Sequence, residues 1–136
     1  MKFFFIFCMV IALIFGNFGP SLGDDYQKGL DAALVGDYKT AIGNWTILAH
    51  EGNAYAQYNL GLIYNKGRGV PQNFKIAKKW YTLSAKQGFA LAQSNLGFMY
   101  DIGEGVFQDV KTAVMWYSLA AKQGNSIAQF YLGEMY

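Results

Sequence analysis

Residues Gly52–Gln87 read GNAYAQYNLGLIYNKGRGVPQNFKIAKKWYTLSAKQ, and Gly88–Gln123 continue at once as GFALAQSNLGFMYDIGEGVFQDVKTAVMWYSLAAKQ. The two stretches are identical at 20 of 36 positions, with no residue inserted between them. A third copy opens at Gly124 as GNSIAQFYLGEMY. A fixed period of this length is typical of a solenoid of stacked supersecondary units. The repeat therefore predicts the architecture of most of the chain.

The first half of each copy carries an apolar stripe at helical spacing. Ala56, Leu60 and Tyr64 lie at positions i, i+4 and i+8, and the same residue types recur in the second and third copies. This pattern predicts a helix over roughly Ala54–Lys66. Gly61, on the same stripe, would let a second helix approach closely, while Leu and Tyr fill the space between the two helices.

The second half of each copy predicts a second helix, which carries the run Trp80-Tyr81 and its repeat. Asn73 and Asp109 precede the two copies of this helix, and both residue types accept hydrogen bonds from the free N–H groups of a first turn. Gly88 and Gly124 follow the helix, where a left-handed residue commonly ends it. Each copy is thus a pair of helices.

The two helices of a pair are joined by GRGVPQN in the first copy and GEGVFQD in the second. Two glycines around a variable residue predict a turn with positive φ, and the valine can anchor the turn in the core. A phosphate-binding loop would also need a preceding strand and a third glycine or a Lys-Ser/Thr pair, and the sequence has none of these. A nucleotide cofactor is therefore not expected.

The columns AxxxLGxxYxxGxGVxxDxxxAxxWYxxAAxxG resemble the Sel-one-like repeat (SLR), a relative of the tetratricopeptide family. The resemblance covers Gly52–Tyr136 and extends more weakly over Asp24–Glu51. It implies an all-α fold, a right-handed α/α superhelix (solenoid) of antiparallel helix pairs. It also implies that the chain binds other proteins or peptides.

The N-terminal residues 1–23 are expected to be a signal peptide. Lys2 precedes an unbroken apolar run, Phe3–Phe15, which is too short to span a bilayer comfortably. Ser21 and Gly23 supply the small residues for cleavage before Asp24, so the protein is expected to be exported, periplasmic or secreted, with no stable membrane span after cleavage. An uncleaved membrane anchor is the alternative. Cys8 would be lost with the signal peptide.

The rest of the chain divides at the repeat boundaries. Residues 24–51 predict a degenerate tetratricopeptide-like hairpin with helices in DYQKGLDAALV and YKTAIGNWTILAHE, whose outer side can cap the stack. The register of its first helix stays open between two alignments. Two SLR repeats follow over 52–87 and 88–123, then an incomplete repeat over 124–136. Its apolar surface indicates a fragment of a longer protein or a helix that docks on something else.

The composition offers little catalytic chemistry, and we expect no enzyme. The single histidine, His50, falls in a column otherwise held by Lys86 and Lys122, at the end of a helix where positive charge is favoured. Without His, Cys or carboxylate clusters no metal site is expected, and no cofactor follows. A formal net charge of +2 for the whole chain, without a basic stripe, argues against nucleic acid.

An alternative function comes from the resemblance. Some secreted SLR proteins form a cysteine-rich subgroup with β-lactam-binding or hydrolysing activity, so a secreted hydrolase or a peptidoglycan-interacting protein is the second candidate. The cysteines of that subgroup are missing here, and no S-x-x-K motif is present. The first candidate remains an exported, non-catalytic adaptor or scaffold that binds a protein or peptide.

The face that such a partner would contact is predicted from the columns that differ between copies. In the first helix of each copy these columns lie at i, i+3 and i+7, on the face opposite the Ala-Leu-Tyr stripe. Apolar and aromatic residues there exceed what a solvated face needs, although packing on a neighbouring repeat would also explain them. We call the six candidate residues the first-helix face: Tyr55, Tyr58, Leu62, Leu91, Phe98 and Phe130. Ser94 lies in the same columns and is expected to tolerate Val almost without cost.

Overall fold

The computed structural model describes residues 22–136, so the predicted signal peptide lies almost entirely outside the described residues. The described part contains seven α-helices and no strand, as an all-α solenoid requires. Their bounds are α2 Leu22–Leu34, α3 Tyr38–His50, α4 Ala54–Lys66, α5 Phe74–Lys86, α6 Ala90–Ile102, α7 Val110–Lys122 and α8 Ser126–Met135. The predicted helix over Ala54–Lys66 is confirmed in full, and the predicted cleavage point before Asp24 falls in the first turn of α2.

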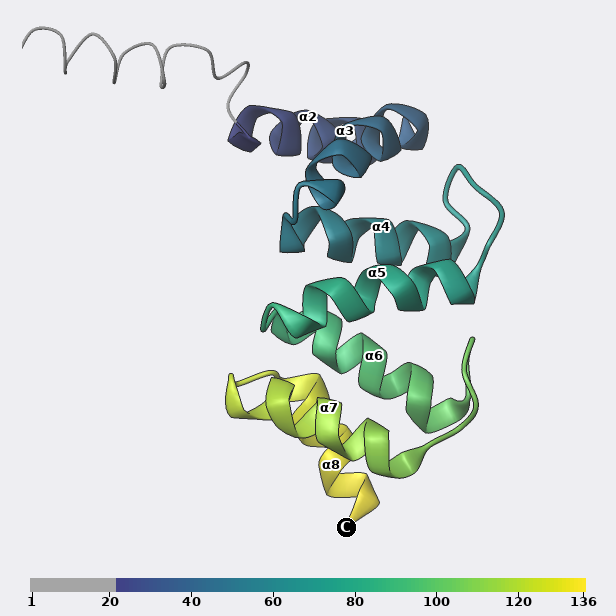
Figure 1. The fold of residues 1–136 in the computed structure, drawn as a ribbon, viewed down its shortest axis with the longest axis vertical. Coiled ribbons are helices and arrows are strands. Elements are labelled where there is room, and N and C mark those ends of the chain that lie inside the picture. The colour runs from purple at the N-terminus through teal and green to yellow at the C-terminus, as the bar shows by residue number, and fades with distance from the viewer. Residues whose placement is uncertain (1–21) are drawn as a thin grey trace, which may run out of the picture.

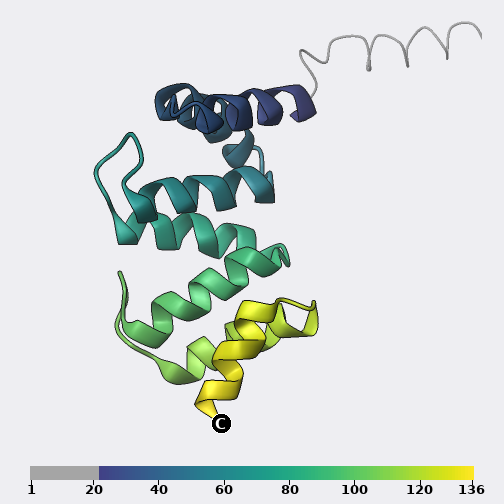
Figure 2. The ribbon, with the colours of Figure 1, turned by 180° about the vertical axis from the view of Figure 1, so that it is seen from behind.

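The helices stack in chain order along the long axis of the molecule (Figures 1 and 2). Each described helix packs mainly against the helices before and after it in the chain, as expected of a solenoid. The core runs the length of the stack as three clusters centred on Trp45, Tyr81 and Tyr117. These three residues occupy the same column of successive second helices.

The glycines of the first helices set the distance between paired helices. A Cβ at Gly61 would lie 2.5 Å from the ring of Tyr81, and a Cβ at Gly97 would lie 2.7 Å from the ring of Tyr117. Both distances are far inside van der Waals contact, so the ring of each buried tyrosine packs directly on a glycine. The predicted close approach of the second helix is confirmed in both repeats.

The predicted helix ends are also confirmed. The side chains of Asp37, Asn73 and Asp109 accept hydrogen bonds from backbone N–H groups in the first turns of α3, α5 and α7. Gly88 and Gly124 follow α5 and α7 with φ of 90° and 87°, a conformation that is cheap only for glycine. Local signals in the sequence thus fix where each helix begins and ends.

A chain of glutamine side chains ties each hairpin to the next. Gln57 and Gln93 donate from Nε2 to the carbonyl oxygens of Ala49 and Ala85, in the last turn of the preceding helix, at 3.0 and 3.2 Å. Gln87 donates in turn to Gln57 Oε1 at 2.8 Å. The equivalent bonds of Gln123 and Gln129 extend the series toward α8. The bonds of Gln57 and Gln93 are buried, and each satisfies a carbonyl group in the last turn of a helix that would otherwise lack a partner.

The structure fixes the register of α2, which the sequence left open. A Cβ at Gly29 would lie 2.3 Å from Trp45 Nε1, so Gly29 takes the place that Gly61 holds against Tyr81. In this register Lys28 and Asp31 replace two apolar residues of α4, Leu60 and Ile63, and both are exposed.

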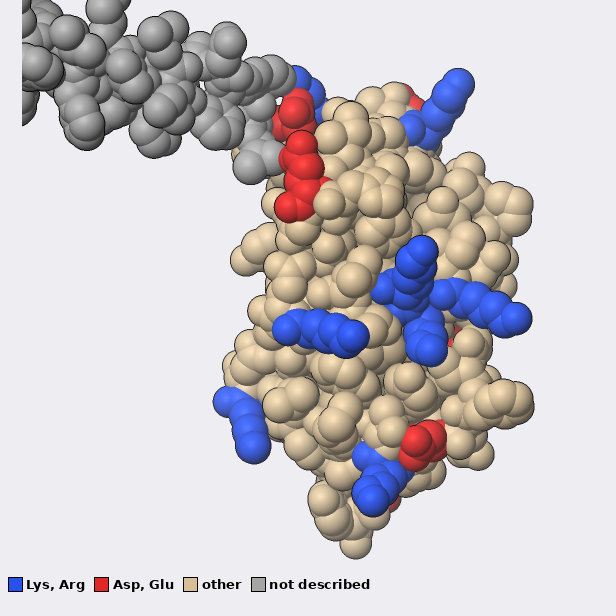
Figure 3. Space-filling view, in the orientation of Figure 1, with Lys and Arg blue, Asp and Glu red and all other residues tan. Residues whose placement is uncertain are grey.

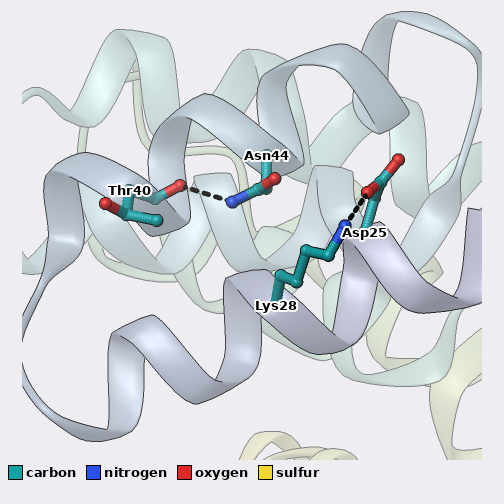
Figure 4. Close-up of polar contacts among 4 residues, drawn as sticks. All are labelled: Asp25, Lys28, Thr40 and Asn44. Atoms are coloured by element: carbon teal, nitrogen blue, oxygen red, sulfur yellow. Dashed lines mark hydrogen bonds and ion pairs between the residues drawn. The ribbon is translucent and has the colours of Figure 1, made fainter. Parts of the chain in front are cut away.

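Polar side chains continue over the first hairpin, as Figure 4 shows. Lys28 Nζ lies 3.0 Å from Asp25 Oδ1, and Asn44 donates to the Thr40 carbonyl oxygen at 3.0 Å. Asn44 stands in the column that holds Trp80 and Trp116 in the later repeats. In the columns of Lys28, Asp31 and Asn44 the first hairpin is therefore polar where the later hairpins are apolar, although its Leu34, Val35 and Ile47 are exposed.

Candidate functional site

A hollow of about 330 Å³ lies on the predicted first-helix face. Three consecutive first helices form it, since α4 and α8 supply its two sides and α6 lies between them. The hollow is lined by Tyr58, Leu62, Asn65, Lys66, Tyr81, Ser94, Asn95, Phe98, Met99, Glu104, Ile127 and Tyr131. We call it the central hollow.

The central hollow exists because one small residue interrupts an aromatic column. Tyr58 and Phe130 occupy this column in α4 and α8, and Tyr26 occupies it in α2, whereas α6 has Ser94. Ser94 is 3% exposed and lies in the lining. The missing ring leaves space between α4 and α8, where an apolar group from a partner would fit.

Polar groups are placed among the apolar lining. The Asn95 side chain is hydrogen-bonded with the phenols of Tyr58 and Tyr81. Burial raises the pKa of both phenols above the usual tyrosine range, and the Asn95 hydrogen bond acts in the opposite direction. Both phenols therefore stay neutral at physiological pH. They can donate or accept hydrogen bonds at the floor of the hollow.

The rim of the central hollow joins two repeats and carries both signs of charge. Asn65 Nδ2, near the end of α4, donates to Glu104 Oε2, in the loop between α6 and α7, at 3.1 Å. Lys66 follows Asn65 and is exposed. An extended peptide chain needs donors and acceptors for its backbone as well as pockets for its side chains, and this rim offers both.

The structure distributes the six predicted residues over three places. Tyr58, Leu62 and Phe98 are half-buried and line the central hollow. Tyr55 and Leu91, which are 57% and 42% exposed, line a second hollow of about 410 Å³ at the N-terminal ends of α4 and α6. Phe130 lines neither and is 63% exposed. The first-helix face is therefore two adjoining hollows and one separate ring.

Some of the predicted residues also support the fold. The rings of Tyr55 and Tyr58 both contact Phe89, with centroids 4.9 and 5.1 Å apart. Phe89 stands at the start of α6, where Asn53 and Asn125 cap α4 and α8, and its side chain forms no capping hydrogen bond. An aromatic cluster thus takes the place of a cap at this one helix. Truncating Tyr58 would disturb packing as well as the hollow.

The predicted solvent-facing position of Ser94 was wrong, whereas its tolerance of Val stays a prediction. Its column differs between copies, which suggested a solvent-facing position, yet the side chain is nearly inaccessible. Ser94 lies in the lining of the central hollow together with residues of α4 and α8, so its surroundings come from the neighbouring repeats. A position can differ between repeats and still be buried when the residues that surround it also differ between repeats.

Sequence reasoning missed several residues of the central hollow, above all Asn95 and Tyr131. Asn95 is identical to Asn59 one period earlier, so comparison of the copies assigned it to the scaffold. Asn59 does have a structural role, because its side chain donates to the Tyr26 hydroxyl at 3.1 Å. The signal that could have revealed the site was the third copy, which places Tyr131 in the same column.

Residues 22–136 offer little evidence for a metal site, a catalytic histidine or a membrane-spanning helix. No group of three or more His, Cys, Asp or Glu side chains in that range could hold a metal ion. His50 is exposed at the end of α3 and lies edge-on against Trp80, with ring centroids 5.4 Å apart. None of the helices within the same range has the length and apolar character to cross a membrane.

Comparisons with known proteins agree with this geometry. The family model described as "Sel1 repeat" matches residues 54–89, 90–125 and 126–136. A search of curated proteins gave no match.

Solved structures give the same result. The chain is similar to a Sel1 repeat protein from Oxalobacter formigenes, at 36% identity and a TM-score of 0.76, over 79% of this chain and 44% of that one. It is also similar to c5321, described as a protective antigen with an SLR fold in uropathogenic Escherichia coli strains. That match has 39% identity and a TM-score of 0.76, over 82% of this chain and 25% of that one. The chain thus spans less than half the length of either protein.

A third solved structure is similar to this chain in fold alone. Cysteine-rich protein B of Helicobacter pylori matches at 17% identity and a TM-score of 0.67, over 81% of this chain and 93% of that one. All three neighbours share the stacking of helix pairs described above.

Proposed function

The chain belongs to the Sel1 repeat family, whose members are generally protein-interaction modules, and we propose that it is an exported, non-catalytic adaptor that binds a peptide segment of a partner protein in the central hollow. The observation that carries this proposal is the loss of one ring from the aromatic column at Ser94, which opens about 330 Å³ between α4 and α8. A space required only by the repeat would recur at every repeat.

The lining specifies the kind of segment that would fit. Leu62, Phe98 and Ile127 offer apolar contact for one side chain of the ligand. Asn65 and Asn95 offer amide groups to its backbone, and Lys66 and Glu104 lie at the rim. We expect an extended peptide whose apolar anchor enters the hollow, because a few buried anchors dominate the energy of such interfaces.

The direct test fills the hollow without removing any existing contact. Ser94→Met would place a flexible apolar side chain into the space, and methionine adapts well to irregular gaps. We expect crosslinking of the full-length protein to its partner in the native cell to be lost, while the melting temperature stays the same or rises. Ser118→Met on α7, outside the hollow lining, is the matched control and should crosslink as the unchanged protein does.

A second variant tests the same site without changing Ser94, because the side chains around a substituted Ser94 could rearrange. Lys66→Glu reverses a charge at the exposed rim, where it cannot disturb the core. It should weaken crosslinking without changing the helical circular dichroism signal. Undiminished crosslinking in both variants would place the partner elsewhere on the molecule.

Export is the second part of the proposal, and it rests on Lys2, the apolar run Phe3–Phe15 and the small residues Ser21 and Gly23. N-terminal sequencing of protein recovered from outside the cytoplasm tests it. We expect the mature chain to begin at Asp24. A chain that retains Met1–Phe15 in the membrane fraction would contradict this part and support an anchor.

A further inference from the structure

A second surface, formed by α5 and the loop before α7, is unlike any other part of the molecule. Phe107 lies in this loop and is 97% exposed, the most exposed large apolar side chain of the described residues. The same column holds Pro71 in the preceding loop. A fully exposed phenylalanine adds nothing to the core, and its ring is available for contact with a partner.

Three lysines lie beside Phe107 on one face of α5. Lys75, Lys78 and Lys79 are spaced at i, i+3 and i+4, and Figure 3 shows blue side chains gathered midway along the molecule, at the level of α5 in Figure 1. None of the three forms an ion pair with another residue in the described range. Lys78 Nζ lies 5.8 Å from the centre of the Tyr100 ring. The positive charge is therefore concentrated on α5, and no ion pair within the described residues offsets it.

The lysines and Phe107 border a continuous depression. One cavity, of about 760 Å³, is lined by Lys75, Lys78, Tyr100, Gly105, Val106, Phe107, Gln108 and Asp109. A second, of about 350 Å³, shares Lys75, Lys78 and Tyr100 and continues along α5 to Leu83. We call the whole depression the basic trough, after Lys75, Lys78, Lys79, Tyr100 and Phe107.

Comparison of the repeats shows that the fold does not require this charge. Positions 78 and 79 correspond to Ile42 and Gly43 in α3. In α7 they correspond to Val114 and Met115. Column 75, by contrast, holds lysine in all three second helices. Lys78, Lys79 and Phe107 are thus peculiar to one place in the stack.

We propose that the basic trough binds an acidic peptide segment of a partner protein that carries an apolar residue next to its carboxylates. The carboxylates pair with Lys78 and Lys79, and the apolar residue packs on Phe107 and Tyr100. Charge complementarity selects this occupant, because a recess lined by unpaired lysines and aromatic rings favours an anionic and partly apolar chain.

Asp109 sets the direction of this ligand. Asp109 lines the cavity at the start of α7, and its carboxylate accepts hydrogen bonds from Thr112 N and Thr112 Oγ1 at 3.1 and 2.6 Å. Its negative charge repels carboxylates at that end. The acidic residues of the peptide therefore lie over α5 and its apolar residue over the loop.

The trough and the central hollow have no lining residue in common. An adaptor with both sites could hold two segments at once. The trough proposal does not depend on the central hollow being occupied.

The test is a selection of random peptides of about ten residues, displayed on phage, against the immobilised full chain. Such a peptide spans about 30 Å when extended, which is ample for the trough. In parallel, the double variant Lys78→Glu/Lys79→Glu is used as the target. We expect peptides enriched only by the unchanged protein to carry several Asp or Glu residues and an apolar residue. Synthetic versions should bind the double variant at least about tenfold more weakly, and binding should weaken with salt.

Matched variants separate the trough from general charge. Lys39→Glu and Lys111→Glu reverse the two lysines that stand in the column of Lys75 in α3 and α7, outside the trough, and should leave binding of the selected peptides unchanged. Phe107→Pro, which copies the preceding loop, should weaken binding several-fold. Ser94→Met should have no effect, so a failure of the central hollow is distinguishable from a failure of the trough.

Two results would overturn the proposal. The first is a selection in which the peptides carry no excess of acidic residues, or in which the double variant enriches the same peptides. The second is sedimentation of the unchanged protein, but not of the double variant, with vesicles containing anionic phospholipid, in the absence of acidic peptide binding. That result would assign the lysines and Phe107 to a membrane surface.

Discussion

The two complete repeats, α4–α5 and α6–α7, share an interior and differ at their surfaces. Gly61 packs on Tyr81 in one repeat and Gly97 packs on Tyr117 in the other, with nearly the same spacing. Outside the core the repeats diverge. The first repeat has Tyr58 where the second has Ser94 on the first helix, and Pro71 where the second has Phe107 in the loop. Each divergence accompanies a depression in the surface. The identical glycine and tyrosine positions thus belong to the scaffold, and these two differing positions lie at the candidate sites.

The largest expected effect tests whether the shared interior is truly equivalent. Gly61→Ala and Gly97→Ala each place a methyl group less than 3 Å from a buried tyrosine ring. We expect both changes to lower the free energy of unfolding by about 1–3 kcal/mol, the usual cost of overpacking a core. Urea denaturation of the two variants measures this. A large difference between them would show that one repeat is packed more loosely than the other.

Gly43→Ala is the control for this prediction, because it is also a glycine inside a helix. A Cβ there would have no neighbour within 4 Å. Relief of glycine's conformational entropy should therefore raise the free energy of unfolding by about 0.5–1 kcal/mol. Replacing glycine with alanine is thus expected to lower the free energy of unfolding at Gly61 and Gly97 and to raise it at Gly43. A lower free energy of unfolding for Gly43→Ala as well would contradict this prediction, since contact with a tyrosine ring would then not explain the losses at Gly61 and Gly97.

Much of the fold could be predicted from the repeat itself, because each recurring column has one physical role. The caps at Asn73 and Asp109 and the left-handed glycines at Gly88 and Gly124 follow from local backbone chemistry, which a single sequence displays directly. The register of α2 could not be predicted. Its shorter connection to α3 shifts the alignment, and only the contact of Gly29 with Trp45 decides it.

The candidate site was predicted less completely, for a related reason. Three of the six residues line the central hollow, and the columns that vary lie on the helices that form it. Whether a varying residue faces solvent or a neighbour depends on side chains one period away, as Ser94 shows. The burial of a side chain depends on several stacked repeats together. Comparing equivalent positions of the repeats examines only one position at a time.

The second prediction concerns a difference inside the otherwise shared core. The Tyr81 phenol is hydrogen-bonded with Asn95, whereas the Tyr117 hydroxyl is buried with no hydrogen-bond partner among the described residues. The cause is Tyr131, which replaces the asparagine and stacks on Tyr117 with ring centroids 5.2 Å apart. Tyr81→Phe should lower the free energy of unfolding by about 1 kcal/mol, since a hydrogen bond is lost.

Tyr117→Phe should leave the free energy of unfolding unchanged or raise it, because an unsatisfied buried hydroxyl is removed. Thermal unfolding of the two variants side by side provides the measurement. Equal losses in both would indicate that Tyr117 has a partner in solution, such as a bound water molecule. In that case the two repeats would be more alike than their contacts suggest.

The smallest expected effect lies at the caps, where the repeats differ by one titratable group. Asn73 caps α5 and cannot titrate, whereas Asp109 caps α7. Hydrogen bonds from Thr112 hold the pKa of the Asp109 carboxyl below its usual value. Because the folded state lowers this pKa, the stabilisation is present above the unfolded value of about 4 and is lost as the pH falls through the folded value. Acid should therefore weaken α7 and leave the cap of α5 intact.

Asp109→Asn makes the two caps alike and isolates this effect. The asparagine side chain can still accept the bond from Thr112 N, so the stability at pH 7 should fall only slightly. As the pH is lowered toward about 2, the unchanged protein should lose stability faster than the variant, and the gap between their urea midpoints should narrow or reverse. Asp37→Asn at the start of α3, where Thr40 lowers the carboxyl pKa in the same way, should behave alike. Midpoint curves that stay parallel over this whole pH range would show that the carboxylate adds nothing beyond what an amide supplies, and the two caps would then be equivalent despite their charge.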